Sequence, residues 1–228
     1  YIGEVASVQT PAIAKAAMHL LKKAGVSFTV LKNEPVSGAY MGDLMGFVDE
    51  VRQQAMKLSA AIDNSGAETV VVLDAMDARI MKHEYADWNC APKAEVLTAT
   101  SYFAQLVADG KLTVKKQDGV VSVHDAGALS RDLGETEPVR ALVCAMGYEN
   151  SEMFRNRDLA KATGGALLQR YDARLAKMLA EGRWEDLTRL GLHTIVTEAP
   201  GSYAALSLAI PEGCTLSDVL VLLDKATD

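Results

Sequence analysis

The chain has 228 residues, a formal net charge of −7 and 49% hydrophobic residues, a composition that excludes long disorder and fibrous repeats. An acidic chain without a run of Lys and Arg is a poor candidate for binding nucleic acid. The three cysteines, Cys90, Cys144 and Cys214, exclude a disulfide framework and an iron–sulfur cluster held by four cysteines of this chain alone.

The sequence also bears on the compartment. No apolar stretch approaches the roughly 18 residues that cross a bilayer, so we expect no membrane span. Scattered thiols without a targeting signal predict a cytoplasmic protein, with membrane association through partners as the alternative. The start, Tyr1-Ile2-Gly3, lacks an initiator Met, and we interpret it as a trimmed terminus with an upstream segment missing.

Short β-rich runs alternate with amphipathic helical stretches along the chain. The first half reads as an opening strand in YIGEVAS, a helix, a strand, a helix and a strand, at residues 1–7, 11–24, 26–31, 47–62 and 70–73. The second half shows strands at residues 120–123 and 194–197, and a helix at 166–179 whose buried face is predicted to be Leu168, Tyr171, Leu175 and Met178. This alternation predicts an α/β protein with mainly parallel strands.

The two halves repeat one another. Each reads as a strand, small or polar residues, a helix, a second strand and a long helix. We therefore predict two lobes, residues 1–118 and 119–228, separated at the turn Gln117-Asp118-Gly119. Each lobe is expected to be a mainly parallel sheet flanked by helices, and a pseudo-twofold axis would relate the two around one shared cleft.

Several sequence words occur in a recognisable order, namely LLKKAGVSFTVL, NEPVSG, HDAGALSR, GETEPVRAL, FRNR and TIVTEAPGSY. On these words the whole chain resembles the CCG-domain (cysteine-rich domain) family. That family includes heterodisulfide reductase catalytic subunits, the small subunit of anaerobic glycerol-3-phosphate dehydrogenase and the iron–sulfur subunits of glycolate oxidation. Each of its two repeats reads approximately C…CCG…C-P-x-C.

According to this resemblance, all ten positions that hold cluster cysteines in the family are occupied by other residue types in this chain. These former ligand positions are Glu4, Val36, Ser37, Asp74, Asp77, Gly127, Ala162, Thr163, Ala199 and Ser202. Cluster iron requires soft thiolate ligands, and Val, Gly and Ala offer no ligating side-chain atom. We therefore expect a degenerate iron–sulfur protein without a cluster or any other cofactor in this chain.

The retained framework and the lost ligands predict a cluster-free structural or docking subunit of a heterodisulfide-reductase-like oxidoreductase complex, without a catalytic site of its own. The resemblance implies a flavoprotein, a ferredoxin-like subunit or a cysteine-bearing paralogue as partner, with FAD or clusters bound there. Two alternatives remain open. The emptied inter-lobe cleft could bind a small molecule, as in an enzyme or a sensor, or a missing N-terminal ferredoxin-type module could carry the redox activity.

Two groups of residues qualify as candidate sites. Glu4, Asp74 and Asp77 could hold Mg²⁺ or Ca²⁺ through oxygen ligands, joined by Asp43; the alternative is a solvated acidic loop in which Asp74 or Asp77 caps the following helix. The small residues at the second set of former ligand positions would leave a void, which we expect to collapse because protein interiors pack densely. His124-Asp125 is expected to orient its loop rather than to catalyse.

Overall fold

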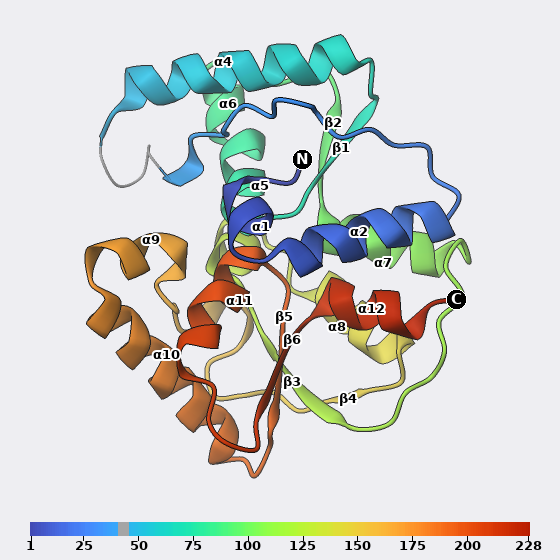
Figure 1. Cartoon of the computed structure of the whole chain (residues 1–228), viewed down its shortest axis with the longest axis vertical. Coiled ribbons are helices and arrows are strands. Elements are labelled where there is room, and N and C mark those ends of the chain that lie inside the picture. Colours follow the sequence, from blue (N-terminus) through green and yellow to red (C-terminus); the bar gives the residue numbers. More distant parts are fainter. Residues whose placement is uncertain (41–45) are drawn as a thin grey trace.

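The computed structural model describes residues 1–40 and 46–228. It is an α/β structure with two parallel sheets and helices around them, which confirms the predicted fold class and its two lobes (Figure 1). The first sheet contains β1 (Thr69–Val72) and β2 (Glu95–Thr98). The second has the strand order β4-β3-β5-β6, formed by β3 (Val120–His124), β4 (Glu149–Asn150), β5 (Thr194–Thr197) and β6 (Thr215–Asp218).

Helices connect these strands in the way that parallel pairing requires. In the first half they are α1 (Glu4–Val8), α2 (Pro11–Lys23), α4 (Val48–Ser65), α5 (Ala75–Lys82), α6 (Glu84–Asp87) and α7 (Ala99–Ala108). In the second half they are α8 (Glu137–Ala145), α9 (Gly165–Tyr171), α10 (Ala173–Thr188), α11 (Pro200–Leu206) and α12 (Val219–Ala226). A π-helical turn over Ala128–Asp132 follows β3.

Both faces of each sheet are covered, because successive side chains of a strand point to opposite faces. In β1, Val70 and Val72 pack into a cluster with residues of α4 and α5, whereas Val71 contacts the cluster built on α2 and α7. In β5, Ile195 joins residues of α10 and α11, while Val196 joins residues of α8 and α12. Figure 1 shows α10 and α11 on one side of the second sheet and α8 and α12 on the other.

The largest hydrophobic cluster crosses from one half of the chain to the other. It contains Leu20 of α2 and Phe103 of α7 together with Val143 of α8 and Leu223 of α12, all four fully buried. The proposed boundary at residue 118 lies in the loop before β3, outside the helices and strands. The two lobes therefore share one core, and the division into domains stays a prediction.

The predicted strand at residues 26–31 is wrong, because this segment is irregular. Its β-branched residues favour an extended strand, but a strand also requires a neighbour to pair with. Beyond the hydrogen bond from Val26 N to Leu21 O, no backbone hydrogen bond joins residues 26–31 to any other described residue. The local propensity is present and the pairing partner is not.

Two further expectations are corrected. The opening segment forms helix α1 rather than a strand, and only Tyr1 pairs with the sheet. The helix predicted over 166–179 is two helices, because the carboxylate of Asp172 accepts a hydrogen bond from Leu175 N at 2.9 Å and begins α10. The break rotates the predicted inner face outwards, so that Tyr171 and Met178 are 63% and 54% exposed.

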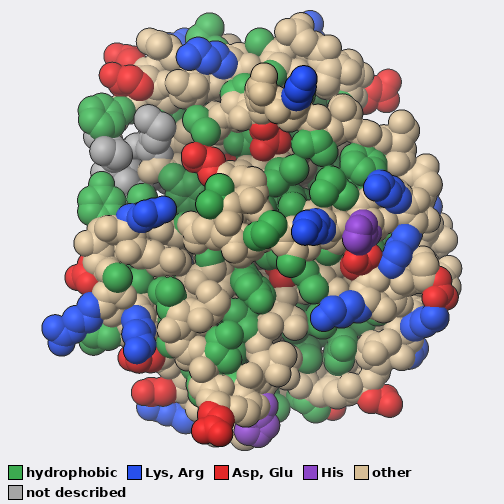
Figure 2. All heavy atoms as spheres, viewed as in Figure 1, with side chains coloured by type: hydrophobic (Ala, Val, Ile, Leu, Met, Phe, Trp, Pro, Cys, Tyr) green, Lys and Arg blue, Asp and Glu red, His purple; other side chains and the backbone are tan. Residues whose placement is uncertain are grey.

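The surface carries charged side chains of both signs. On the face seen in Figure 2, basic and acidic side chains are interspersed rather than separated into patches. Within residues 1–40 and 46–228, no helix combines the length and the apolar character that a membrane crossing requires.

The shared core predicts that the two halves unfold together. Phe103→Ala should cost about 3–5 kcal/mol of unfolding free energy, as for other buried Phe residues, whereas Met178→Ala on the exposed face of α10 should change it by less than about 0.5 kcal/mol. Urea unfolding followed by circular dichroism and by fluorescence of the buried Trp184 measures both. Two separate transitions, of which Phe103→Ala leaves one unchanged, would contradict the shared core.

Candidate functional site

A cleft of about 290 Å³ lies between the two lobes. It is bordered by the residues that follow β1, β3 and β5, at the carboxyl ends of parallel strands, which is where open α/β sheets bind ligands. The first lobe contributes Tyr40 and the residues 74–76, and the second lobe contributes the rest of the wall. Most of the second-lobe lining is small: Ala126, Gly127, Ala128, Ala162, Thr163, Gly164, Gly165, Ala199, Gly201 and Ser202.

The structure brings together six of the ten former ligand positions in this cleft, namely Asp74, Gly127, Ala162, Thr163, Ala199 and Ser202. The other four positions lie outside its lining. Ser37 and Asp77 are buried against each other, Val36 is half-buried beside them in sequence, and Glu4 is exposed on α1. The sequence pattern thus located the wall of a cleft. The expectation that these positions bind no cofactor stays a prediction.

The void at the second set of positions has not collapsed, contrary to expectation. Part of it is filled by Arg131, whose Nη1 donates to the carbonyl of Ala160 at 2.9 Å. A Cβ atom at Gly127 would stand only 2.1 Å from Nη2 of this guanidinium. The missing side chain of Gly127 therefore makes room for a cation, and the space beside it remains open.

Asp74 joins the two lobes at the floor of the cleft. Its Oδ1 accepts hydrogen bonds from Met76 N at 2.9 Å, which caps α5, and from the Tyr40 hydroxyl at 2.9 Å. Its Oδ2 accepts from Gly201 N of the second lobe at 3.0 Å. Burial raises the pKa of this carboxyl, and these donors oppose the rise. The predicted helix cap is confirmed for Asp74, but its surroundings are buried rather than solvated.

Asp77 lies one helical turn further along α5 and is 3% exposed. Its Oδ1 accepts from the Ser37 hydroxyl at 2.5 Å, while Oδ2 is buried without a hydrogen-bond partner among the described residues. Burial and the neighbouring Asp74 raise its pKa well above the usual range.

The structure does not support the expected cation site at Glu4, Asp74 and Asp77. Within the described part of the chain, no group of three His, Cys, Asp or Glu side chains is placed to hold a metal ion. Glu4 faces solvent while the other two carboxyls are buried in hydrogen bonds. Asp43, the expected fourth ligand, lies outside the described residues.

His124 and Asp125 are held by two arginines rather than by each other. Nε of the buried Arg183 donates to His124 Nδ1 at 3.1 Å, and burial together with this cation lowers the histidine pKa to about 3. Asp125 accepts two hydrogen bonds from Arg140, at 2.6 and 3.0 Å. A neutral histidine and a paired carboxylate leave no acid–base dyad, in line with the structural role expected for this pair.

Among the lining residues that sequence reasoning missed are Tyr40, Arg131 and Lys161. Arg131 is the last residue of the motif HDAGALSR and lies one helical turn after Gly127. A charged residue at this spacing from a glycine is a signal from which its place beside Gly127 could have been predicted. Lys161 pairs with Asp186 at 2.8 Å, and Tyr40 follows Ala39 without any motif. These two are placed by tertiary packing alone.

No family model matches the chain. A probable membrane-anchored ferredoxin of Chromohalobacter salexigens is 25% identical over an alignment of 223 residues, and the match covers 94% of this chain and 33% of that protein. The chain thus spans about a third of the length of this curated relative. At this identity the match does not establish a family, and the resemblance to the CCG-domain proteins stays a prediction.

Three solved structures resemble the chain, each at 11% identity. A "putative Asp/Glu Racemase" from Yersinia pestis has a TM-score of 0.43 and covers 98% of this chain and 94% of its own. An aspartate racemase homologue from Pyrococcus horikoshii has a TM-score of 0.37, covering 98% and 93%, and the aspartate racemase of Picrophilus torridus 0.38, covering 94% and 88%. The likeness is one of general arrangement and transfers no residue role.

These comparisons correct the expected function. The three solved structures named above carry the names of racemases or a racemase homologue, and none of the three is named as a subunit of a heterodisulfide-reductase-like complex. The expectation of a cluster-free docking subunit is therefore wrong, and the descriptions as heterodisulfide-reductase-like and as a CCG-domain complex subunit find no support among them.

The buried carboxyl of Asp77 predicts a pH-dependent stability. Its pKa is raised in the folded chain, so stability is highest below the unfolded pKa of about 3.9 and falls as the pH rises through the folded pKa. Asp77→Asn keeps an oxygen that can accept the hydrogen bond from Ser37. It removes the ionisable carboxyl and therefore the loss of stability at higher pH. We expect it to raise the unfolding free energy at about pH 7, by about 1.4 kcal/mol for each unit by which the pKa is raised.

Urea unfolding at about pH 4, 5.5 and 7 measures this effect. The advantage of Asp77→Asn should shrink towards zero near pH 4, where the carboxyl is protonated in both states. Asp118→Asn, in an exposed loop, serves as the matched control and should show no trend. An advantage that is the same at every pH, or a loss of stability at pH 7, would exclude the raised pKa as its cause.

Proposed function

We propose that the chain binds a small organic acid in the inter-lobe cleft. The observation that carries the proposal is Arg131: only its Nη1 has hydrogen-bond partners among the described residues, the carbonyls of Ala160 and Asp158, which leaves Nε and Nη2 free to donate. An arginine with free donors in a fixed fork is suited to a carboxylate, which it can bind through two parallel hydrogen bonds.

The size of the cleft supports a small ligand. Its volume of about 290 Å³ is at the lower end of the roughly 300–1,000 Å³ that is typical of small-molecule pockets, so the ligand would have only a few carbon atoms. Both oxygens of Asp74 are already engaged by three donors. This carboxyl therefore shapes the floor of the cleft without offering a free lone-pair edge to the ligand.

Thermal unfolding in the presence of small carboxylates tests the proposal. The panel would contain acetate, lactate, succinate, aspartate and glutamate, with succinamide as the uncharged match to succinate. A ligand at 100 times its Kd stabilises the folded state by about 2.7 kcal/mol, so at least one acid should raise the Tm and succinamide should not.

Arg131→Met should weaken that acid at least tenfold in calorimetric titration, because it removes the charged donor and keeps a side chain of similar length. Arg174→Met, on the exposed face of α10, is the control and should bind as the unchanged chain does. If no carboxylate shifts the Tm, or if Arg131→Met binds with unchanged affinity, the proposal fails.

A second candidate function rests on the sequence comparison alone. We propose that the chain is the cluster-free part of a longer electron-transfer protein whose ferredoxin-type module lies elsewhere in the polypeptide. Its support is the 25% identity to one third of a probable membrane-anchored ferredoxin. The chain's own thiols are free and dispersed, with Cys144 exposed and Cys90 and Cys214 half-buried, whereas a cluster is usually held by four cysteines.

Iron and acid-labile sulfide, measured after anaerobic purification, test this second candidate. Residues 1–228 alone should contain neither, and the complete natural polypeptide should contain both in stoichiometric amounts. Stoichiometric iron in residues 1–228 would show that the chain binds a cluster itself. A complete polypeptide without iron would remove the ferredoxin-type module.

A further inference from the structure

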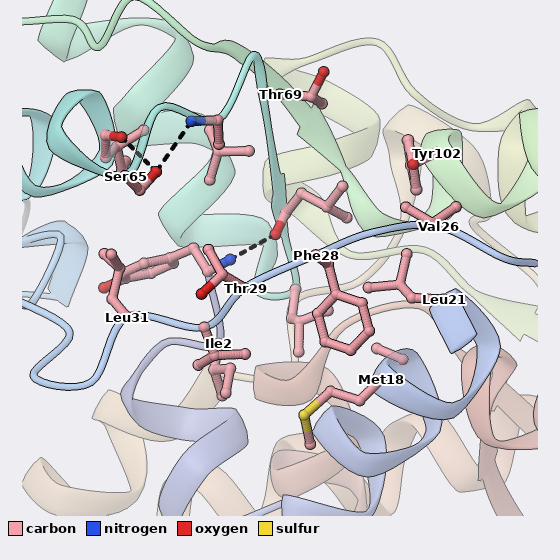
Figure 3. A pocket seen from close by; sticks show the side chains of 18 of the residues that line it. Ile2, Met18, Leu21, Val26, Phe28, Thr29, Leu31, Ser65, Thr69 and Tyr102 are labelled. Carbon is pink, nitrogen blue, oxygen red and sulfur yellow. Dashed lines mark hydrogen bonds between the residues drawn. The ribbon is translucent and has the colours of Figure 1, made fainter.

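A second, larger cavity of about 510 Å³ opens in the first lobe, between α2, the irregular segment 26–31 and β1. Figure 3 shows it from close by, with Phe28 pointing towards Met18 and Leu21 of α2. In Figure 2 apolar side chains gather over the same region, between α2 and the segment 26–31. This cavity is separate from the inter-lobe cleft, because the two share no lining residue.

Tyr1 stands at the inner end of the cavity and is paired with β1. Its amino nitrogen donates to Val71 O at 2.8 Å, and its carbonyl accepts from Leu73 N at 3.2 Å. Hydrogen bonds to the residues on either side of Val72 form the pattern of a parallel ladder. Tyr1 is therefore one residue of a third parallel strand, on the edge of β1 opposite to β2.

The rest of that edge is unpaired. Alternate residues of a strand direct their backbone groups to the same edge, so Thr69 faces the cavity in the way that Val71 and Leu73 face Tyr1. On the opposite wall, no backbone group of residues 27–31 has a hydrogen-bond partner among the described residues. Unpaired strand edges are the sites at which proteins accept an additional strand.

The second lobe shows how the same arrangement looks when it is complete. There β3, five residues long, lies between β4 and β5. In chain order, Tyr1 corresponds to β3, the segment 26–31 to β4 and β1 to β5. In the first lobe, Tyr1 alone corresponds to the five-residue central strand β3 of the second lobe. The cavity lies where the other residues of such a strand would be.

The walls of the cavity specify the chemistry of its occupant. One side is formed by Ala14, Ala17 and Leu21 of α2, and the other receives Ile62 of α4. A strand covered on both faces consists of nearly continuous Val, Ile and Leu residues. Burial also lowers the pKa of the Tyr1 amino group, whereas a peptide N–H at this atom would make the same hydrogen bond to Val71 without a charge.

We propose that this cavity is a β-strand site, filled by an apolar extended segment that is joined to Tyr1 by a peptide bond and runs parallel to β1. The segment pairs with Thr69 and Val71 on one side and brings residues 26–31 into the sheet on the other. A length of four or five residues matches β1 and β3, which have four and five.

Two chains extended before Tyr1 test the site. One carries the five residues Thr-Val-Ile-Val-Val and the other carries Gly-Ser-Gly-Ser-Gly. Hydrogen exchange read by mass spectrometry or NMR should show at least tenfold slower exchange at Thr69, Val71 and residues 27–31 in the apolar extension than in the Gly-Ser extension. Equal exchange in the two chains would overturn the proposal.

A substitution in the wall of the cavity makes the test specific. Leu21→Glu should abolish the added protection in the apolar extension, whereas Lys22→Glu, on the exposed side of the same helix, should leave it unchanged. Sedimentation at two protein concentrations distinguishes the source of the strand. Protection that rises with concentration in a dimer means that a second copy supplies the strand, which contradicts a segment joined to Tyr1 of the same chain.

Discussion

The arrangement of the two lobes around their cleft depends on the buried carboxylate of Asp74. This one side chain begins α5, fixes Tyr40 and accepts a hydrogen bond from the backbone of Gly201 in the second lobe. A buried acceptor stays favourable only while its donors are present, because an unpaired polar group in the interior costs about 1–3 kcal/mol. The position of each lobe relative to the other is thereby tied to the ends of β1 and β5, where the cleft opens.

A second contact between the lobes lies where β2 ends and α7 begins. Glu135 of the second lobe accepts from the hydroxyls of Thr98 and Ser101, and Lys82 approaches it at 3.4 Å. Together with the shared hydrophobic cluster, these contacts hold the lobes as one body. A rigid junction suits a small cleft, because fixed walls lower the entropy lost when a ligand is ordered.

Periodicity predicted most of the fold and less of the site. The helix 11–24 and the strands at 70–73, 120–123 and 194–197 were predictable because their pattern and their neighbours favour the same structure. The segment 26–31 has the right residues and lacks a partner strand, and 166–179 is divided by the cap at Asp172. Propensity acts within a few residues, whereas pairing and burial depend on distant parts of the chain.

The same limit explains the site. Six of the ten positions that the resemblance to the CCG-domain family predicts line one cleft, because residues that follow parallel strands converge in space. The sequence motifs do not predict which side chains fill the space between these positions. No local sequence pattern predicts that the Arg131 side chain lies against Gly127 or that the Tyr40 hydroxyl donates to Asp74.

The two sets of former ligand positions that the resemblance predicts show how residue size and charge decide the local structure. In the first lobe the acid and the hydroxyl are long enough to meet, so Ser37 donates to Oδ1 of Asp77, while Oδ2 stays without a partner among the described residues. In the second lobe the replacements are Gly, Ala, Thr and Ser, which are too short to meet across the gap. Interiors tolerate a void poorly, and here a guanidinium from the following turn enters it while a cavity remains beside the cation. An open space with an incompletely bonded positive charge at its wall is what a small anion requires, so the proposed binding site depends on the small side chains of the second lobe.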